Sequence, residues 1–298
     1  MFNRWTASPP ILKGTVLMLL SAVCFSILLV MIRVVGQAVP VVLVIVARQI
    51  VMQVVIFAQA GRSVGSILRT NSLRLQLWRA VFALGSTVAT YVTFIYLPLA
   101  LASAISFTTA LFVTIGAALF LKEHVAPKTW AATLIGLVGV YIMLSPTQAG
   151  SLPFVLLAIA GAILSAGMIL SVRGLDPAES VGTVLTYQGI LILPALIVPL
   201  VMTWQMPTPG QWLALLAIGV IGTLGQWTLV GAYRHAEAAR LAPLDFLRLV
   251  LIAAAGLVFF DEQLQPSLIA GMLIIVATTL YTIRANAAAR IEEIPALP

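Results

Sequence analysis

Charge is scarce in this sequence. Only 8% of its 298 residues are Asp, Glu, Lys or Arg, whereas 61% are hydrophobic. Soluble domains carry roughly 25% charged residues, because their surfaces are solvated by water. So few charges could not cover the surface of a soluble protein of this size. The composition therefore excludes a water-soluble fold and indicates an integral membrane protein, with the lipid bilayer as its partner.

Cysteine is almost absent as well, because Cys24 is the single one. An internal disulfide and a cysteine metal cluster are therefore excluded. The sequence contains no phosphate-binding loop and no nucleophile beside a base, which disfavours an ATP-driven pump and a membrane enzyme. It predicts no catalytic residue, metal or cofactor. The net charge of +7 comes from scattered basic residues rather than runs, so we expect no nucleic-acid partner.

Long apolar runs, in contrast, are abundant, and many are close to the ~20 residues that cross a bilayer as a helix. Short connections rich in glycine and proline separate them and leave no room for a soluble domain. The first run is longer than a signal-peptide core and no cleavage pattern follows it, so we expect a spanning helix there. Ten transmembrane helices are predicted, at residues 12–33, 40–60, 76–95, 98–121, 128–145, 152–172, 182–203, 211–232, 241–260 and 266–284.

The basic residues give this arrangement an orientation, because cytoplasmic loops of membrane proteins are enriched in Lys and Arg. With a cytoplasmic N-terminus, thirteen basic residues fall on the cytoplasmic side and only Arg33 on the other, while Arg48 and Arg248 lie inside helices. Both termini are therefore predicted to be cytoplasmic. The thirteen are Arg4, Lys13, Arg62, Arg69, Arg74, Arg79, Lys122, Lys128, Arg173, Arg234, Arg240, Arg284 and Arg290.

An internal repeat organises the ten helices. Aligning Glu123 with Glu262 also places Phe120 on Phe259, so the first five helices match the second five. Because five is an odd number, the second copy must be inverted relative to the first, as in many secondary transporters whose substrate site lies between the halves. The predicted parts are a first repeat at 12–145, a second repeat at 152–284 and a cytoplasmic tail at 285–298.

Residues 96–125 (YLPLALASAISFTTALFVTIGAALFLKEHV) and 232–264 (AYRHAEAARLAPLDFLRLVLIAAAGLVFFDEQL) resemble the paired EamA domains of the drug/metabolite transporter superfamily. The resemblance covers nearly the whole chain. It implies an all-α integral membrane fold of ten helices in two inverted repeats, and transport of small metabolites, prominently amino acids and their analogues, often outward. Where the family usually has Gly-Glu after the fourth and ninth helices, this chain has Lys122-Glu123 and Asp261-Glu262.

Three charged residues inside the predicted helices are the first candidates for a substrate site. Arg48 lies about 10 Å from the outer end of its helix at 1.5 Å per residue, whereas Asp245 and Arg248 lie about 6 and 10 Å from the inner end of theirs. A direct Arg48–Asp245 pair is therefore not expected. Asp245 and Arg248 could pair on their own helix. Alternatively, either arginine could hold a substrate carboxylate, with Asp245 binding an ammonium group or a proton.

Neutral polar and aromatic residues complete the predicted site, although interhelical hydrogen bonding or close packing would explain each of them equally well. The predicted substrate-binding residues are Arg48, Tyr91, Ser106, Thr109, Tyr187, Gln226, Trp227, Asp245 and Arg248. Glu123 and Glu262 stand apart, because each ends a helix where the macrodipole disfavours an anion. We expect each to have a structural partner such as a backbone donor, in preference to a transport role.

The sequence therefore predicts a secondary transporter in a bacterial-type inner membrane, working by alternating access on a small-molecule substrate. Export of amino acids or analogues is the first expectation. Alternatives are a proton-coupled transporter of drugs, nucleobases or sugars, and a membrane enzyme or scaffold. The chain could act as a monomer, and the sequence leaves substrate, direction, coupling and oligomeric state open.

Overall fold

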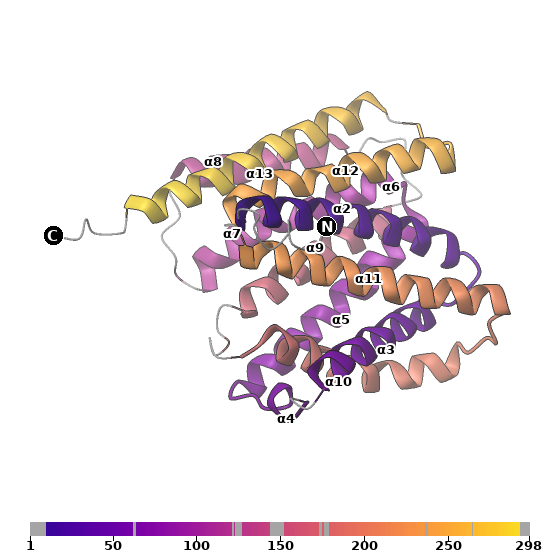
Figure 1. Ribbon diagram of the computed structural model, residues 1–298. Helices are drawn as coiled ribbons and strands as arrows, with labels where there is room; N and C mark the ends of the chain where they lie inside the picture. The colour runs from indigo at the N-terminus through magenta and orange to yellow at the C-terminus, as the bar shows by residue number, and fades with distance from the viewer. Residues whose placement is uncertain are drawn as a thin grey trace. The chain divides into compact units, whose positions relative to one another are not determined.

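A computed structural model describes residues 10–61, 64–120, 122, 127–143, 152–172, 175, 179–235, 238–263 and 265–292. These ranges fold into helices joined by short connections (Figure 1). The helices are α2 (Pro10–Val35), α3 (Val41–Ala60), α4 (Val64–Ile67), α5 (Leu73–Tyr96), α6 (Leu99–Phe107), α7 (Thr109–Phe120), α8 (Pro127–Met143), α9 (Leu152–Val172), α10 (Val181–Met202), α11 (Pro209–His235), α12 (Ala238–Phe260) and α13 (Pro266–Glu292).

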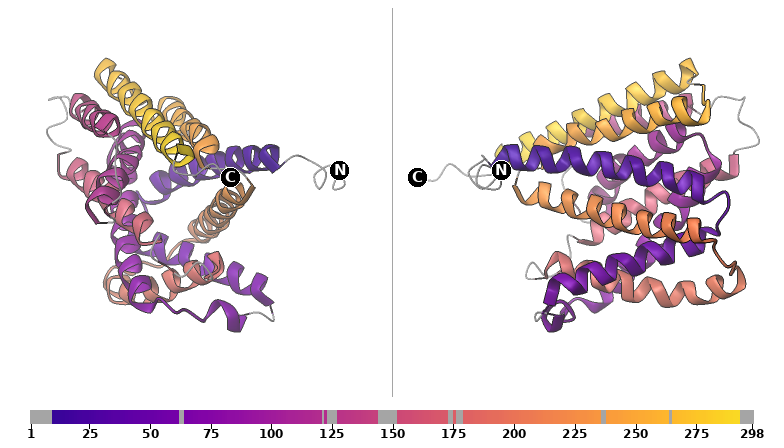
Figure 2. Two further views of the ribbon diagram at one scale, coloured as in Figure 1. Left: turned by 90° about the vertical axis from the view of Figure 1, so that its left-hand side faces the viewer. Right: turned by 45° about the vertical axis from the view of Figure 1, so that its right-hand side comes forward.

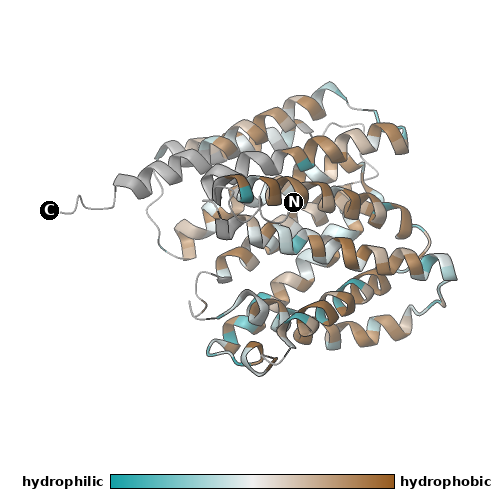
Figure 3. Cartoon of the chain, viewed as in Figure 1, coloured by the Kyte–Doolittle hydropathy of each residue, from teal (hydrophilic) through white to brown (hydrophobic). Residues whose placement is uncertain are grey.

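Apolar residues dominate along these helices, while several helix ends and connections are hydrophilic (Figure 3). Within the described ranges, seven helices are long and apolar enough to cross a membrane, and three more carry shorter apolar segments. Many of the large apolar side chains on them are exposed, Phe120, Tyr141 and Met202 among them. Such a surface suits lipid rather than water. The protein is thus an all-helical, multi-pass membrane protein.

Helices occupy all ten of the predicted segments, with two differences. The predicted helix 98–121 is divided into α6 and α7 at Thr108, whose hydroxyl donates to the Ile105 carbonyl at 2.6 Å. A threonine hydroxyl that competes for the backbone in this way disturbs a helix. The last helix runs to Glu292 rather than ending near 284, because residues 285–289 include four alanines, the best helix former.

The chain forms two compact units, and each unit draws on both halves of the sequence. The first unit contains residues 1–26, 98–150 and 225–298; the second contains 27–97 and 151–224. The helices α2 and α11 each contribute one part to each unit. The unit boundaries therefore do not follow the sequence repeats.

In the first unit, α8 packs along α13 and α6 packs against α12 (Figures 1 and 2). Small residues make the close approach possible: a Cβ at Gly139 would lie 2.8 Å from the Ile274 side chain. Almost the whole of α6 is buried. The predicted repeat aligns α8 with α13 and α6 with α12, so this unit pairs helices that the repeat alignment matches.

In the second unit, α5 packs along α9, while α10 contacts both α3 and α5. Ala89 of α5 lies directly against Gly161 of α9, and Gly85 of α5 leaves room for Leu164. The C-terminal end of α5 is held by Arg33, which donates to the Leu97 carbonyl, and by Gln37, which donates to the Ile95 carbonyl at 3.0 Å. These contacts join α5 to α9, to the end of α2 and to the turn that follows α2.

The residues that follow α7 and α12 share a left-handed backbone conformation. Lys122 and Asp261, which coincide in the repeat alignment, have φ values of 53° and 52°. This is the left-handed conformation that glycine adopts at little cost, which accounts for the usual glycine of the resembled family at both places. At Asp261 the turn reverses the chain, and the N–H of Glu262 donates to the Gly256 carbonyl at 3.1 Å.

Glu262 has the structural partner that its position predicts. Its carboxylate accepts the backbone N–H of Leu99, at 2.7 and 2.9 Å for the two oxygens. Leu99 is the first residue of α6, so the anion lies at a helix N-terminus, where the macrodipole favours it. The C-terminus of α12 is thereby joined to the N-terminus of α6. Glu123 lies outside the described residues.

Candidate functional site

The second unit contains a charged centre formed by α3 and α5. The Arg48 side chain of α3 lies beside the Tyr91 hydroxyl of α5 and interacts with it electrostatically. Tyr91 is only 3% exposed. Within the described part of the chain, neither the Arg48 Nε nor the Tyr91 hydroxyl has a hydrogen-bond partner of normal geometry. Buried polar groups are almost always hydrogen-bonded, so these two atoms are candidates for contact with a ligand.

Gly222 of α11 makes room for Arg48 at this centre. A Cβ at Gly222 would lie 2.8 Å from the Arg48 Nε and 3.4 Å from its Cδ. Both residues belong to the second unit. The bare backbone of Gly222 therefore lets the Arg48 side chain lie close against α11.

The first unit contains a second charged centre, built around Arg248 of α12. Its guanidinium carbon lies 5.1 Å from the centre of the Phe107 ring and 5.9 Å from that of Phe25. Both distances are in the range of cation–π contacts, which stabilise a cation away from water. Phe107 ends α6 just before the break at Thr108, in the middle of the apolar segment Leu99–Phe120. Thr108 itself keeps helical dihedral angles, so α6 and α7 together form one apolar span.

The other predicted site residues are distributed over both units. Ser106 donates to its own helix at the Ala102 carbonyl, and Thr109 is the half-buried first residue of α7. The Tyr187 hydroxyl donates to the Leu68 carbonyl at 2.8 Å, so it joins α10 to the segment after α4.

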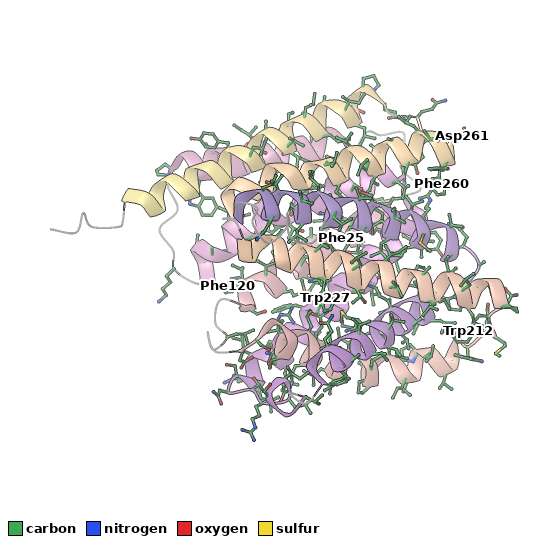
Figure 4. The ribbon with its side chains drawn as sticks, viewed as in Figure 1. Phe25, Phe120, Trp212, Trp227, Phe260 and Asp261 are labelled. Atoms are coloured by element: carbon green, nitrogen blue, oxygen red, sulfur yellow. The ribbon has the colours of Figure 1, made fainter. Side chains whose placement is uncertain are left out.

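In the first unit, Gln226 is half-buried, whereas Trp227 is 39% exposed. Figure 4 labels Trp227 on α11 and Phe25 on α2. The backbone of Asp245 lies in α12, but its side chain is outside the described residues. The local pairing of Asp245 with Arg248 therefore stays a prediction.

Sequence reasoning missed several residues that build these centres. Phe25 and Phe107 look like ordinary core residues in a chain this apolar, and their relation to Arg248 depends on helix packing. Arg79 is the most informative of the residues that sequence reasoning did not identify. It counts as a cytoplasmic residue in the charge distribution, yet it is only 6% exposed. From the predicted helix start at residue 76 it would lie only about 4.5 Å inside, whereas the observed start at Leu73 places it about 9 Å inside.

Comparison with known proteins identifies the family. The model of the EamA-like transporter family matches residues 12–145 and 152–284, almost the whole chain. The protein belongs to the EamA-like transporter family. It is therefore a transporter rather than an enzyme, as the sequence predicts.

Curated relatives of this EamA-like transporter have different named substrates. A riboflavin transporter of Vibrio cholerae is 35% identical over 60% of this chain and 60% of its own length. An S-adenosylmethionine uptake transporter of Rickettsia bellii is 30% identical over 66% and 68% of the two chains. A pseudopaline exporter of Pseudomonas aeruginosa is 25% identical over 90% and 95%. The family is thus clear, while the named cargoes and directions differ.

A solved crystal structure shares the fold of the whole chain. It covers 96% of this chain and 100% of its own, with a TM-score of 0.62 at 19% identity. At that identity the likeness concerns the fold alone.

Proposed function

We propose that this protein is a secondary transporter that moves a small carboxylate-bearing metabolite across a bacterial-type inner membrane by alternating access. The observation that carries the proposal is the contact of the half-buried Arg48 with the buried Tyr91 hydroxyl within apolar helices, where the Arg48 Nε has no partner among the described residues. A charge at this depth is costly unless a partner or a function maintains it. The planar guanidinium offers two parallel donors to a carboxylate, and the Tyr91 hydroxyl adds a third.

The proposed topology has ten spans in two inverted five-helix repeats, with both termini in the cytoplasm. It is supported by helices at all ten predicted segments and by the one-sided distribution of Lys and Arg. In such folds the two repeats rock around a central site and open it to each side in turn.

Amino acids and molecules derived from them are the first proposed cargo. They carry the carboxylate that Arg48 suits, and S-adenosylmethionine, the substrate named for one relative, is itself an amino-acid derivative. Export is the proposed direction for amino acids, but relatives are named for uptake as well as export. Flux must therefore be measured in both directions.

Riboflavin is the second candidate cargo, because the Vibrio relative and a Rhizobium relative are both named riboflavin transporters. Riboflavin has no carboxylate for Arg48 to hold. Its fused ring system could instead stack on a guanidinium or an aromatic side chain, and Arg248 with Phe25 and Phe107 offers both.

Proteoliposomes provide the test. Uptake and efflux of the amino acids, S-adenosylmethionine and riboflavin are compared for wild type, Arg48→Gln, Tyr91→Phe and empty liposomes. Arg74→Gln is the matched control, because Arg74 is an exposed arginine on α5. We expect carboxylate-bearing cargo to move with wild type and Arg74→Gln, and at least tenfold more slowly with Arg48→Gln. Movement of riboflavin alone, unaffected at Arg48, would contradict the proposed cargo.

A further inference from the structure

The second unit contains another buried arginine, in the half opposite to Arg48. Arg79 of α5 is 6% exposed, and its one described hydrogen bond is a long one, 3.4 Å from Nη1 to the Val184 carbonyl. Its Nε is buried without a partner, and no ion pair reaches Arg79 within the described residues. An arginine that reached the membrane surface would have its guanidinium exposed, so snorkelling does not account for it.

Three further buried side chains with an unsatisfied polar atom lie on α5 and on the two helices that contact it, α3 and α10. They belong to Gln53 of α3, Gln76 of α5 and Thr186 of α10, each buried. Gln53 donates to the Leu185 carbonyl at 3.0 Å, and Arg79 to that of Val184, so both side chains meet the second turn of α10 beside Thr186. Bare Gly189 leaves the space that the Gln53 amide fills.

Glu179 orients the Gln76 side chain rather than neutralising Arg79. It accepts hydrogen bonds from the Thr70 hydroxyl at 2.5 Å and the Gln76 amide at 2.7 Å. Burial by itself raises the pKa of Glu179, but these bonds, with others from Ser72 and Asn71, lower it below the ordinary value. Because the Gln76 nitrogen faces Glu179, its carbonyl oxygen is left as the unsatisfied atom.

We propose that Arg79, Thr186, Gln53 and Gln76 form a second binding site, in the half of the unit predicted to be cytoplasmic, for an α-hydroxy or α-amino carboxylate. Arg79 and Thr186 supply donors for the carboxylate. The two glutamine oxygens accept from the hydroxyl or ammonium group next to it. The proposed binding rests on these contacts alone. A further role, as a site that transported cargo occupies on the cytoplasmic side, rests on the proposed function.

A carboxylate from solution fits this place better than a lipid headgroup. The four side chains are 0 to 6% exposed, with Thr186 fully buried among them. Lipid phosphate would have to reach between α3, α5 and α10. A small soluble ligand can enter when the helices separate slightly, and it leaves them satisfied once bound.

Thermal unfolding of the full-length protein in phosphatidylcholine nanodiscs tests the site, with malate and aspartate as probes and asparaginamide as the carboxylate-free control. Unfolding is followed by reaction of the single, buried thiol of Cys24 with a maleimide dye. We expect both probes, but not asparaginamide, to raise Tm saturably in wild type and in Arg74→Gln. In Arg79→Gln the half-saturating concentration rises at least tenfold, and Arg79→Lys recovers part of the effect.

A second set of variants keeps the test decisive if Arg79→Gln folds poorly. Thr186→Val and Gln53→Leu are each expected to weaken the probes severalfold. Equal half-saturation in wild type and Arg79→Gln, loss of the effect only in Arg48→Gln, or no stabilisation by either probe would each refute the site. If phosphatidylglycerol alone produced a stabilisation that depends on Arg79, the site would bind lipid instead. Because Tm is measured without transport, a failure of transport leaves this result standing.

Discussion

At the scale of single residues, the main feature of the second unit is a pair of arginines. Arg48 and Arg79 both lie within apolar helices, and each has a buried Nε without a partner in the described part of the chain. Arg248 of the first unit is different, because two phenylalanine rings contact its guanidinium. Burying a cation without compensation costs several kcal/mol, about the stability of many domains. We interpret the two unsatisfied arginines as positions where ligand binding provides that compensation.

Gly222→Ala is a sharp probe of the Arg48 position, because it leaves the arginine itself intact. The added methyl would lie 2.8 Å from the Arg48 Nε, so the guanidinium has to shift. A shift of about 1 Å in a binding group can cost on the order of 100-fold in rate. We expect transport in proteoliposomes to fall at least tenfold while the protein still folds and inserts.

The control is Gly210→Ala on the same helix, where a Cβ meets nothing within 4 Å. Its transport rate should match wild type. Wild-type transport in Gly222→Ala would show that the close packing of Arg48 on α11 is not needed for function.

Sequence reasoning reached some of these residues and not others. The depth of Arg48 follows from counting residues along its helix, and so does the rejection of an Arg48–Asp245 pair. Its neighbour Tyr91 is on another helix, and their contact depends on how α3 and α5 pack. The same counting did not reach Arg79, because the predicted helix starts at residue 76 and places it in the first turn, whereas the observed helix starts at Leu73.

At the scale of elements, the sequence predicts helices well and their ends less well. Apolar runs bounded by glycine and proline place a helix at every predicted segment. The break between α6 and α7 was not predicted, because Thr108 stands in a run of small and apolar residues that is compatible with a continuous helix. The sequence predicts that Glu262 has a backbone donor as its partner. That this donor is the first N–H of α6 could not be predicted, because it depends on how α6 packs on α12.

Glu262→Gln tests this junction of α12 and α6. A charged carboxylate accepting a backbone N–H is stronger than a neutral amide, so the substitution is expected to cost about 1–2 kcal/mol. Equilibrium unfolding in detergent would show the loss. Gly256→Ala should act in the same direction, since its Cβ would lie 2.5 Å from the Glu262 Oε2.

The control for the junction is Asp261→Asn. It removes a neighbouring charge, and asparagine tolerates the left-handed backbone found there. We expect its stability to stay within about 0.5 kcal/mol of wild type, as for most exposed substitutions. If Glu262→Gln is no less stable than Asp261→Asn, the hydrogen bond to Leu99 contributes nothing measurable.

At the scale of the whole molecule, each compact unit combines helices from both sequence halves. The family match identifies a transporter. The sequence could predict the class, because hydropathy and charge are global properties. It could not predict the cargo, because a few side chains decide that.

The predicted orientation can be tested with single cysteines in a Cys24→Ser background. Met206→Cys lies in the exposed connection between α10 and α11, and Gly65→Cys lies in α4, where a Cβ meets nothing within 4 Å. In intact cells a membrane-impermeant maleimide should label Met206→Cys, and Gly65→Cys only after permeabilisation. The reverse pattern would show that the orientation is opposite to the predicted one. Labelling of both sites from outside would show that the number of spans between them is even rather than odd.

The central claim is that Arg48 and Tyr91 hold the carboxylate of the transported molecule. The most direct measurement is kcat/KM in proteoliposomes for each transported amino acid, or S-adenosylmethionine, against its carboxamide. In wild type we predict at least a tenfold preference for the carboxylate, corresponding to about 1.4 kcal/mol. Arg48→Gln should abolish that preference and Tyr91→Phe should reduce it. A preference of the same size in wild type and Arg48→Gln would contradict the account.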